Sequence, residues 1–587
     1  MFHSAFRPYS RPNDAPNEGP HSRPDSRPVR RLAAIIGLVA LVAAACSSSD
    51  DGDSTGNGGN GGNGSSDYAL VRTTVPEPEG PPVRGGRLVY AVESDTSSPW
   101  TPQAAVCAIS CHVVMRSVFD PLTVVNADGE IEPFLAESFD ANDDFTEWTF
   151  TARDGVTFHD GTPLDGAAIA TNLEGHIQSV LTGTVLRDAT GVASDGMTAT
   201  ITFSSPWADF PRQVTGQIGY IASPTWLAEA ATDTEVAAKP IGTGPFKFKS
   251  YDAGIQAVYV GEANPDYWIE GLPYLEEIEV RALPNAAQRI EGVRSGQIDI
   301  THSSGGIDIA EVRDDESITL IETRDFSETD YLLLNVSNPG SALFDVRVRR
   351  ALAMATDREL YTETREDSVA EPANGPFNPT QPGYLPDTGY PDYDPDGARQ
   401  LVEEYEAENG PINIVVKTTT DPRNQQTIEQ LRSGWSDVGI DTSTDEVPQN
   451  AFIVQALTGN FEAFLWRNHG GASPDAQNHW WHGDVANADS PLGINFGRID
   501  DEVINEQLDL IRSSDDPDVV REGGEAINRR FAEQVYNLWA GWTVWGIFAD
   551  PSVQNITQME LPSGNLIRPF GMGIGGTHWL AQIWKTA

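Results

Sequence analysis

The stretch DPDGARQLVEEYEAENGPINIVVKTTTDPRNQQTIEQLRSGWSDVGIDTSTDEV, residues 394–447, decides the fold class of this chain. It opens with a predicted helix over 394–410, because Asp394 can cap the helix and Pro395 suits its first turn. The pattern then predicts strand 412–418, helix 422–439 and strand 440–447. Helices that alternate with strands indicate an α/β protein in which helices cover a sheet.

The segments on either side of this stretch extend the same pattern. Upstream, GGRLVYAVE (85–93) predicts an opening strand, and DYLLLNVS (330–337) predicts a strand covered on both faces. Downstream, LWAGWTVWGIF (538–548) predicts a buried strand that crosses between two units of the fold. Residues from about 119 to 239 predict a compact α+β unit, with a strand pair over 147–164.

Length and charge limit the function classes. A chain of 587 residues is too long for one hydrophobic core, so two or three packed units are expected. Its 38 basic and 86 acidic residues give a formal charge of −48, which repels phosphate backbones and excludes nucleic acid as an expected partner. The acidic surface has two open interpretations: solubility or adaptation to salt, which we favour, and attraction of cationic ligands.

The N-terminus carries the pattern of an export signal. Residues rich in Arg, Pro and Ser precede LAAIIGLVALVAAA (32–45), an apolar run too short to span a bilayer comfortably. The next residue is Cys46, and the small residues before it resemble the lipobox of bacterial lipoproteins, except that Ala43 stands where Leu is usual. We predict a signal peptide over 1–45 and a lipid on Cys46. Cleavage without lipidation and an uncleaved anchor are the alternatives.

The residues after Cys46 predict a tether on the outer face of the cell membrane. Residues 46–83 are rich in Gly, Ser, Asn and Asp, and they are expected to be disordered. In that oxidising compartment Cys107 and Cys111 are expected to form a short-range disulfide. CAISCH (107–112) also resembles an expanded haem c attachment motif, and two free thiols are the third possibility.

No catalytic signature is present in the sequence. It contains no G-x-S-x-G, H-E-x-x-H, Walker or C-x-x-C motif, and the Gly-rich GMGIGG (571–576) lacks a βαβ unit around it and predicts a loop. His469, His479 and His482 could together bind a transition metal, but we favour loop residues that line an interface or a pocket. We therefore expect a protein that is not an enzyme and has no cofactor or bound metal.

Several phrases, in this order, resemble one protein family. They are RSVFDPLTVVNADGEIEPFLAESFD (116–140), EWTFTARDGVTFHDGTPLDGAAIATNLE (147–174), PIGTGPFKF (240–248), NPDYW (264–268), LPYLEEIEVRALPNAAQRIEGVRSGQIDI (272–300), LLLNVSNPGSALFDVRVRRALAMATDRE (332–359) and YDPDGARQLV (393–402). Through them the chain is similar to the family 5 extracellular solute-binding proteins. That group contains the dipeptide-, oligopeptide- and nickel-binding components of ABC importers. The resemblance covers about residues 84–550.

The resemblance implies a two-lobed α/β fold of the periplasmic-binding-protein type (class II, cluster C-like), with a hinge between the lobes and an extra α+β domain in the first. The implied division is 84–118 and 240–325 for the first lobe, 119–239 for the extra domain, 326–550 for the second lobe and 551–587 for a return to the first. The resemblance also implies a monomer that buries its ligand in the cleft between the lobes. Its partners would be a membrane permease and ATPase subunits.

The expected ligand residues follow from the same resemblance. The loop after the first strand, from Glu93 to Ser98, would line the cleft in the first lobe, with Glu93, Asp95, Thr96 and Ser97 as candidates. In the second lobe, FEAFLWRNHGGASPDAQ (461–477) and the residues just after it would contribute Trp466, Arg467, Asn468, His469, Asp475 and Trp480.

One departure from the family pattern concerns the ligand's ammonium group. Peptide-binding members commonly carry a Trp and, a few residues on, an Asp that pairs with this ammonium. Trp466 is present here, but Gly470 or Gly471 stands at the aligned Asp position. Either Asp475 substitutes for that Asp, or the ligand lacks the ammonium. Arg467 offers a planar fork for a carboxylate, and the tryptophans nearby could stack on a sugar or hold apolar side chains.

We expect an exported component of an ABC importer that captures di- or oligopeptides when its lobes close. An oligosaccharide, an opine-like compound or a metal chelate on the same fold is the alternative ligand. An exported hydrolase, and a sensory or chaperone role without transport, are alternatives from other classes.

Overall fold

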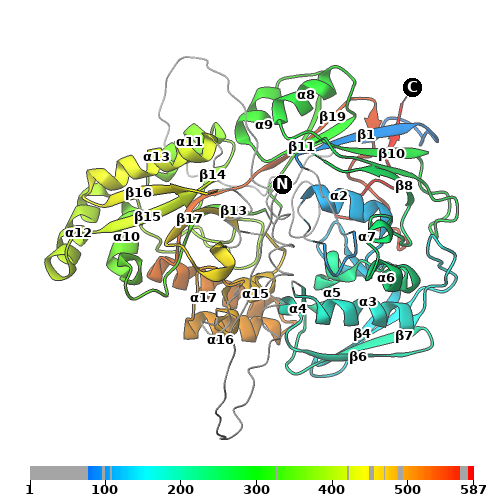
Figure 1. Cartoon of the computed structure of the whole chain (residues 1–587), viewed down its shortest axis with the longest axis horizontal. Helices are drawn as coiled ribbons and strands as arrows, with labels where there is room; N and C mark the ends of the chain where they lie inside the picture. The colour runs from blue at the N-terminus through cyan, green and yellow to red at the C-terminus, as the bar shows by residue number, and fades with distance from the viewer. Residues whose placement is uncertain are drawn as a thin grey trace, which may run out of the picture.

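The computed structural model describes residues 77–586, apart from 95–99, 106, 108, 181, 255, 326, 420–421, 448–454, 469, 487–493 and 569–578. Cys46, the predicted signal peptide and most of the predicted tether lie outside these residues. The part of the chain that is described contains no helix long and apolar enough to cross a membrane. It includes two large mixed sheets and a smaller antiparallel sheet, with helices packed on each (Figure 1).

The first unit is built on a seven-stranded sheet that contains the predicted opening strand. In spatial order its strands are β12 (Thr319–Thr323), β19 (Trp545–Ala549), β11 (Ile300–Ser303), β1 (Arg87–Val92), β10 (Glu277–Ala282), β9 (Val258–Ala263) and β8 (Phe246–Asp252). β1 lies at the centre, parallel to β10 and β11. Its helices are α2 (Ile109–Val118), α8 (Ala286–Arg294) and α9 (Gly306–Val312), and every residue of α2 is buried.

The second unit is built on a six-stranded sheet, in the order β14 (Glu371–Pro372), β18 (Asn537–Trp542), β13 (Thr329–Leu334), β17 (Ala463–Asn468), β15 (Asn413–Thr418) and β16 (Asp441–Glu446). The predicted alternation over 394–447 is confirmed as α12 (Pro395–Asn409), β15, α13 (Pro422–Asp437) and β16. As predicted, Asp394 caps α12, because its side chain accepts a hydrogen bond from the backbone N–H of Gly397 at 2.9 Å.

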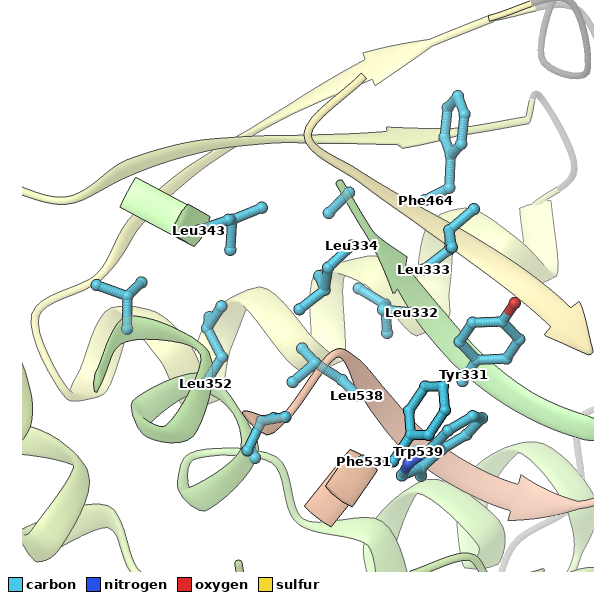
Figure 2. Close-up of a cluster of buried hydrophobic side chains, with 14 of the residues drawn as sticks. Tyr331, Leu332, Leu333, Leu334, Leu343, Leu352, Phe464, Phe531, Leu538 and Trp539 are labelled. Atoms are coloured by element: carbon cyan, nitrogen blue, oxygen red, sulfur yellow. The ribbon is translucent and has the colours of Figure 1, made fainter. Parts of the chain in front are cut away.

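The core of the second unit surrounds β13, the strand predicted to be covered on both faces. All six of its residues are buried. Successive side chains point to opposite faces of the sheet. Tyr331 packs against Trp539, with ring centroids 5.0 Å apart (Figure 2). The covering helices are α10 (Val346–Met354), α11 (Arg358–Glu366), α16 (Glu502–Arg512) and α17 (Pro517–Gln534), together with the short η4 (Pro474–Gln477) and α15 (Asn478–Trp481).

The third unit is the smaller antiparallel sheet, which falls within the predicted α+β unit. Its strands are β4 (Ala136–Ala141), β5 (Glu147–Ala152), β7 (Thr198–Phe203) and β6 (Ala189–Asp195), and α3 (Gly166–Gln178) packs on them. Asp165 starts α3 by accepting a hydrogen bond from Ala168 N. Short elements complete this region: β2 (Thr123–Val125), β3 (Ile131–Pro133), α4 (Thr182–Val185), α5 (Phe210–Gln213), α6 (Pro224–Ala230) and α7 (Thr234–Ala237).

Two connections, which we call the double crossing, join the first and second units. One runs from β12 to β13, and the other is Thr543–Val544 between β18 and β19. The predicted strand over 538–548 does cross between units, but as two strands, one in each sheet. The connections lie side by side, because Thr543 N donates to Glu328 O at 2.9 Å. With β19 the chain is back in the first unit, and there β20 (Val553–Gln554) pairs with β21 (Trp584–Lys585).

Candidate binding site at the double crossing

Glu93 and His302 stand at the ends of two neighbouring parallel strands beside the double crossing. Glu93 directly follows β1, and its Oε2 contacts Nε2 of His302 in β11. The other ring nitrogen of His302, Nδ1, is 3.1 Å from Tyr90 Oη. The two ring nitrogens of His302 thus contact two different groups, Glu93 and Tyr90. Burial alone would raise the pKa of Glu93, but His302 and then Arg289 outweigh it and hold that pKa below its ordinary value. Glu93 is therefore a carboxylate at neutral pH.

Trp545 and Glu328 extend the row of polar contacts formed by Tyr90, His302 and Glu93 toward the double crossing. Trp545 Nε1 donates to Glu328 Oε2 at 2.7 Å, and the Trp545 ring lies edge-on to His302 with centroids 5.8 Å apart. Burial raises the pKa of Glu328, and the positive charge of Arg467 only partly opposes this rise. The row thus links the first sheet to the connections that lead into the second.

Arg467 joins the second unit to the first. It lies directly opposite Asp330 across β17 and β13, and its Nε donates to Asp330 Oδ1 at 2.8 Å. Its Nη1 donates to Ser304 Oγ, one residue past β11, at 2.9 Å. The fork that was predicted to hold a ligand carboxylate is thus engaged by Asp330 and Ser304. Its role toward a ligand stays a prediction.

Trp466 points to the opposite face of the sheet from Arg467, because neighbouring residues of a strand alternate. Its ring packs edge-on against Phe496, with centroids 5.2 Å apart, and the Trp480 ring packs against the same Phe496 at 5.5 Å. Both tryptophans are partly buried against the core of the second unit. The structure therefore brings Trp466 and Trp480 together and separates Trp466 from Arg467.

A second contact between the two units lies at Glu366, the last residue of α11. Glu366 Oε2 accepts a hydrogen bond from the N–H of Gly306, the first residue of α9, at 2.8 Å. A Cβ at Gly306 would lie 2.1 Å from the carbonyl oxygen of Glu366, so only glycine permits this close approach. Burial raises the pKa of Glu366, and Arg365 opposes the rise.

Asp475 lies in a third contact, which we call the rim contact and define as Trp207, Asp475 and Arg512. Trp207 belongs to the third unit, and its Nε1 donates to Asp475 Oδ2 at 2.8 Å. Arg512 Nε donates to Asp475 Oδ1 at 2.8 Å, and its Cζ lies 4.0 Å from the ring centroid of Trp207. Arg187 of the third unit also donates to Asn478 Oδ1 at 2.7 Å. Both Asp475 oxygens are thus engaged by protein groups.

The other predicted site residues divide into two groups. Asn468 is buried at the end of β17, opposite Thr329. Asp95, Thr96, Ser97 and His469 fall outside the described residues, as does the lipidation site Cys46. Cys107 and Cys111 are joined by a disulfide, with their Cα atoms 5.0 Å apart. The described residues include no group of three or more His, Cys, Asp or Glu side chains that could hold a metal ion.

Sequence reasoning missed the partners of the predicted residues. Asp330 gave a usable signal, since it stands at the head of an apolar strand where a charge needs a partner. His302 gave none, because a single histidine near the end of a strand is compatible with many roles. Trp207 and Arg512 also gave none, since each becomes important only through a unit that lies far away along the chain.

The chain is similar to a known protein family and to several named proteins. A family model for bacterial extracellular solute-binding proteins, family 5, matches residues 130–490. Di/tripeptide-binding protein 2 of Pseudomonas aeruginosa is 27% identical over 392 residues, which cover 62% of this chain and 70% of that protein. Heme-binding protein A of Haemophilus influenzae is 26% identical over 394 residues, which cover 59% and 68%. Relatives at similar distance thus carry names for different ligands.

Solved structures share the fold of this chain. The oligopeptide-binding protein AppA of Bacillus subtilis, in complex with a nonapeptide, superposes with a TM-score of 0.71 at 19% identity, covering 86% of this chain and 100% of that one. The periplasmic binding protein AgaA of A. tumefaciens, in complex with agropinic acid, gives 0.70 at 22% identity, covering 80% and 94%. These likenesses confirm the predicted two-lobed α/β fold.

Proposed function

This chain belongs to the family 5 bacterial extracellular solute-binding proteins, and we propose from this that it captures peptides outside the cytoplasm and delivers them to the permease of an ABC importer. One observation carries the proposal: Arg467 of the second unit reaches Ser304 of the first at 2.9 Å beside the double crossing. A solute held there would contact both units at once. Relatives named as di/tripeptide- and dipeptide-binding proteins favour a peptide as that solute.

Capture would proceed by closure of the units about the double crossing. Three contacts bridge separate units: Arg467 with Ser304, Glu366 with Gly306, and the rim contact. Opening about the double crossing would break them, and closing would remake them around the solute. Because a ligand shifts such an equilibrium only by its difference in affinity for the two states, a solute that touches both units favours the closed one.

The site offers a replacement for the ammonium-binding Asp that the sequence lacks. Both oxygens of Asp475 are already held by Trp207 and Arg512. Glu93 is an ionised carboxylate at the end of β1, where the predicted binding loop begins. We assign ammonium recognition to Glu93, and we assign apolar side chains of the peptide to the half-buried Trp466 and Trp480.

The lipid on Cys46 would keep the protein near its permease. The Gly-rich segment after Cys46 acts in this proposal as a flexible link, so the effective concentration at the permease stays high. A single acyl chain gives only marginal membrane binding, so stable anchoring requires more than one chain. Mass spectrometry of the mature N-terminus tests this part separately. An unmodified Cys46 contradicts the anchor and leaves solute binding intact.

Native mass spectrometry of protein purified from its own host tests the ligand class. A ladder of co-purified peptides supports the proposal, whereas a discrete sugar, opine or metal complex contradicts it. The same peptides should show unchanged masses when they are analysed by mass spectrometry after incubation with the protein. Cleavage products would instead favour the exported hydrolase.

A further inference from the structure

Arg116, in the last turn of α2, is a buried cation with no acidic partner among the residues that the structure describes. The residue is 6% exposed. Its Nε donates to Tyr220 Oη at 3.2 Å, and its Cζ lies 5.3 Å from the ring centroid of Trp579. Nη1 has no hydrogen-bond partner, and no carboxylate among the described residues pairs with the guanidinium. An unneutralised buried cation is unexpected in a chain with 86 acidic and 38 basic residues.

Two other buried arginines differ from Arg116 in that several carbonyl oxygens accept hydrogen bonds from each guanidinium. Arg289 is 1% exposed and donates to Thr301 Oγ1 and to the carbonyl oxygens of Leu283, Pro284 and His302. Arg349 is 4% exposed and donates to the carbonyl oxygens of Leu343, Phe344, Gln534 and Val535. Arg116 has one hydrogen bond, to Tyr220. A buried charge left this incomplete is unfavourable unless another group completes it.

The guanidinium of Arg116 lies toward the amino-terminal end of α2. Long side chains in a helix lean back toward its N-terminus. His112, one turn earlier, confirms this direction, because its Nδ1 lies 3.0 Å from the same Tyr220 Oη. Burial, followed by the charge of Arg116, lowers the pKa of His112 to about 3, so His112 stays uncharged. The first turn of α2 also contains no acidic residue. The first-turn N–H groups and the guanidinium of Arg116, which leans toward them, therefore both contribute positive potential to the amino-terminal side of α2.

This end of α2 lies next to the candidate binding site. Ser110, the second residue of the helix, accepts a hydrogen bond at 3.3 Å from Ser94, and Ser94 directly follows Glu93. The disulfide between Cys107 and Cys111 fixes the entry into the helix. In Figure 1, α2 lies on the inner side of the first unit, toward the second.

We infer that Arg116 and the first turn of α2 form an anion-binding subsite, and that this subsite accepts a carboxylate of the bound solute. The inference rests on the proposed function, because it names a chemical group of the solute. A peptide supplies this carboxylate at its C-terminus, where it would complete the hydrogen bonding of Arg116 Nη1. A neutral oligosaccharide has no such group.

The test compares wild type with Arg116→Met, after unfolding and refolding have removed any co-purified ligand. Arg521→Met, on the exposed face of α17, is the matched control for loss of one positive charge. Calorimetry measures binding of a set of tripeptides with free carboxylates and of the same tripeptides as C-terminal amides. We expect wild type and Arg521→Met to prefer the acids by about 30-fold or more, as for a buried charge pair that loses one partner. Arg116→Met should show no preference.

Two measurements need no peptide. The melting temperature of ligand-free Arg116→Met should equal or exceed that of wild type, because an unneutralised buried cation is replaced by an apolar chain of similar length. A structural role for Arg116 would lower it. Acetate should raise the melting temperature of wild type more than acetamide, its neutral isostere, and this difference should vanish in Arg116→Met.

The outcomes separate this inference from the proposed function. Equal binding of acids and amides by wild type, or a preference that persists in Arg116→Met, overturns the subsite and leaves peptide capture standing. If neither protein binds any peptide, the proposed ligand class fails. The melting temperatures measured with acetate and acetamide then test the subsite. Stabilisation confined to proteins with Arg116 supports it, and equal stabilisation in Arg116→Met overturns it.

Discussion

Trp207 Nε1 donates a hydrogen bond to Asp475 Oδ2 at 2.8 Å, across two units whose contacting residues are separated by 268 positions in the chain. Trp207 is 1% exposed and Asp475 is fully buried. The third unit, which contributes no strand to either large sheet, therefore holds the second unit on the side away from the double crossing. This arrangement makes closure measurable through single side chains.

Trp207→Phe should loosen the rim contact. The substitution keeps an aromatic ring in place but removes the N–H, which leaves Asp475 Oδ2 without its donor and costs the closed form about 1–3 kcal/mol. Small-angle scattering should show a larger radius of gyration than in wild type. Trp226→Phe is the control, because Trp226 Nε1 donates at 2.9 Å to Val236 O within the same unit. Identical scattering from both variants would contradict a role for the rim contact in closure.

Arg467→Met should destabilise the fold strongly. It leaves Asp330, which is 6% exposed, as an unneutralised charge, and the loss of one partner from such a pair costs about 3–5 kcal/mol. Urea unfolding measures the change in the free energy of unfolding. Adding Asp330→Asn should recover most of the loss, since no charge is then stranded. Single and double variants of equal stability would show that Arg467 and Asp330 do not act as a pair.

Asp120 should make stability fall as pH rises through the acid range. Its carboxylate accepts hydrogen bonds from Thr243, Tyr267 and Trp268, yet burial raises its pKa to about 6. The unfolded chain has a pKa near 3.9, so between about pH 4 and pH 6 the folded state keeps a proton that the unfolded state loses. Stability from this group is therefore complete below that window and is lost across it.

Asp120→Asn removes this dependence. The difference in free energy of unfolding between wild type and Asp120→Asn should change by about 2 kcal/mol from pH 4 to pH 6.5, with wild type relatively more stable at the lower pH. Urea midpoints measured at both pH values provide the comparison. Parallel pH profiles would show that Asp120 titrates as in the unfolded chain.

Replacing Cys107 and Cys111 together by Ser should lower stability modestly. The disulfide closes a short loop, with a sequence separation of 4, and so small a loop contributes about 2 kcal/mol. The melting temperature with and without reductant measures this effect in wild type, and the double variant should not respond to reductant. A thiol assay on denatured, unreduced protein should find no thiol when Cys46 is acylated. One thiol per chain would indicate an unmodified Cys46.

Local chemistry made much of the fold predictable from the sequence. Asp394, Pro395 and the apolar face behind them specify α12 through neighbours along the chain, and the structure confirms it. The crossing over 538–548 was visible as an apolar run, but its division at Thr543 was not. The point at which the run divides into β18 and β19 depends on which sheet each part pairs with, and this pairing is set by residues far away in the chain.

The candidate site was harder to predict from the sequence than the fold, for two physical reasons. Strand alternation places Trp466 and Arg467 on opposite faces, but no strand was predicted over 463–468, so this separation was not anticipated. The partners of Arg467 and Asp475 were not available, because Ser304 and Trp207 reach them only through the packing of separate units. Resemblance to a family indicated the loop that begins at Glu93, but no sequence motif singles out Arg116, because its burial and contacts follow from the tertiary fold.

The double crossing has a mechanical consequence. A single connection would let two rigid bodies swivel and twist about it like a ball joint. Here a backbone hydrogen bond from Thr543 to Glu328 holds two connections side by side. Twisting of one unit against the other would have to break this hydrogen bond, whereas bending would not. If the units move as proposed, this pairing would limit their relative motion toward one degree of freedom, rotation about a fixed axis. Each opening should bring the same surfaces back into register, and a transport partner would meet one reproducible shape in every cycle.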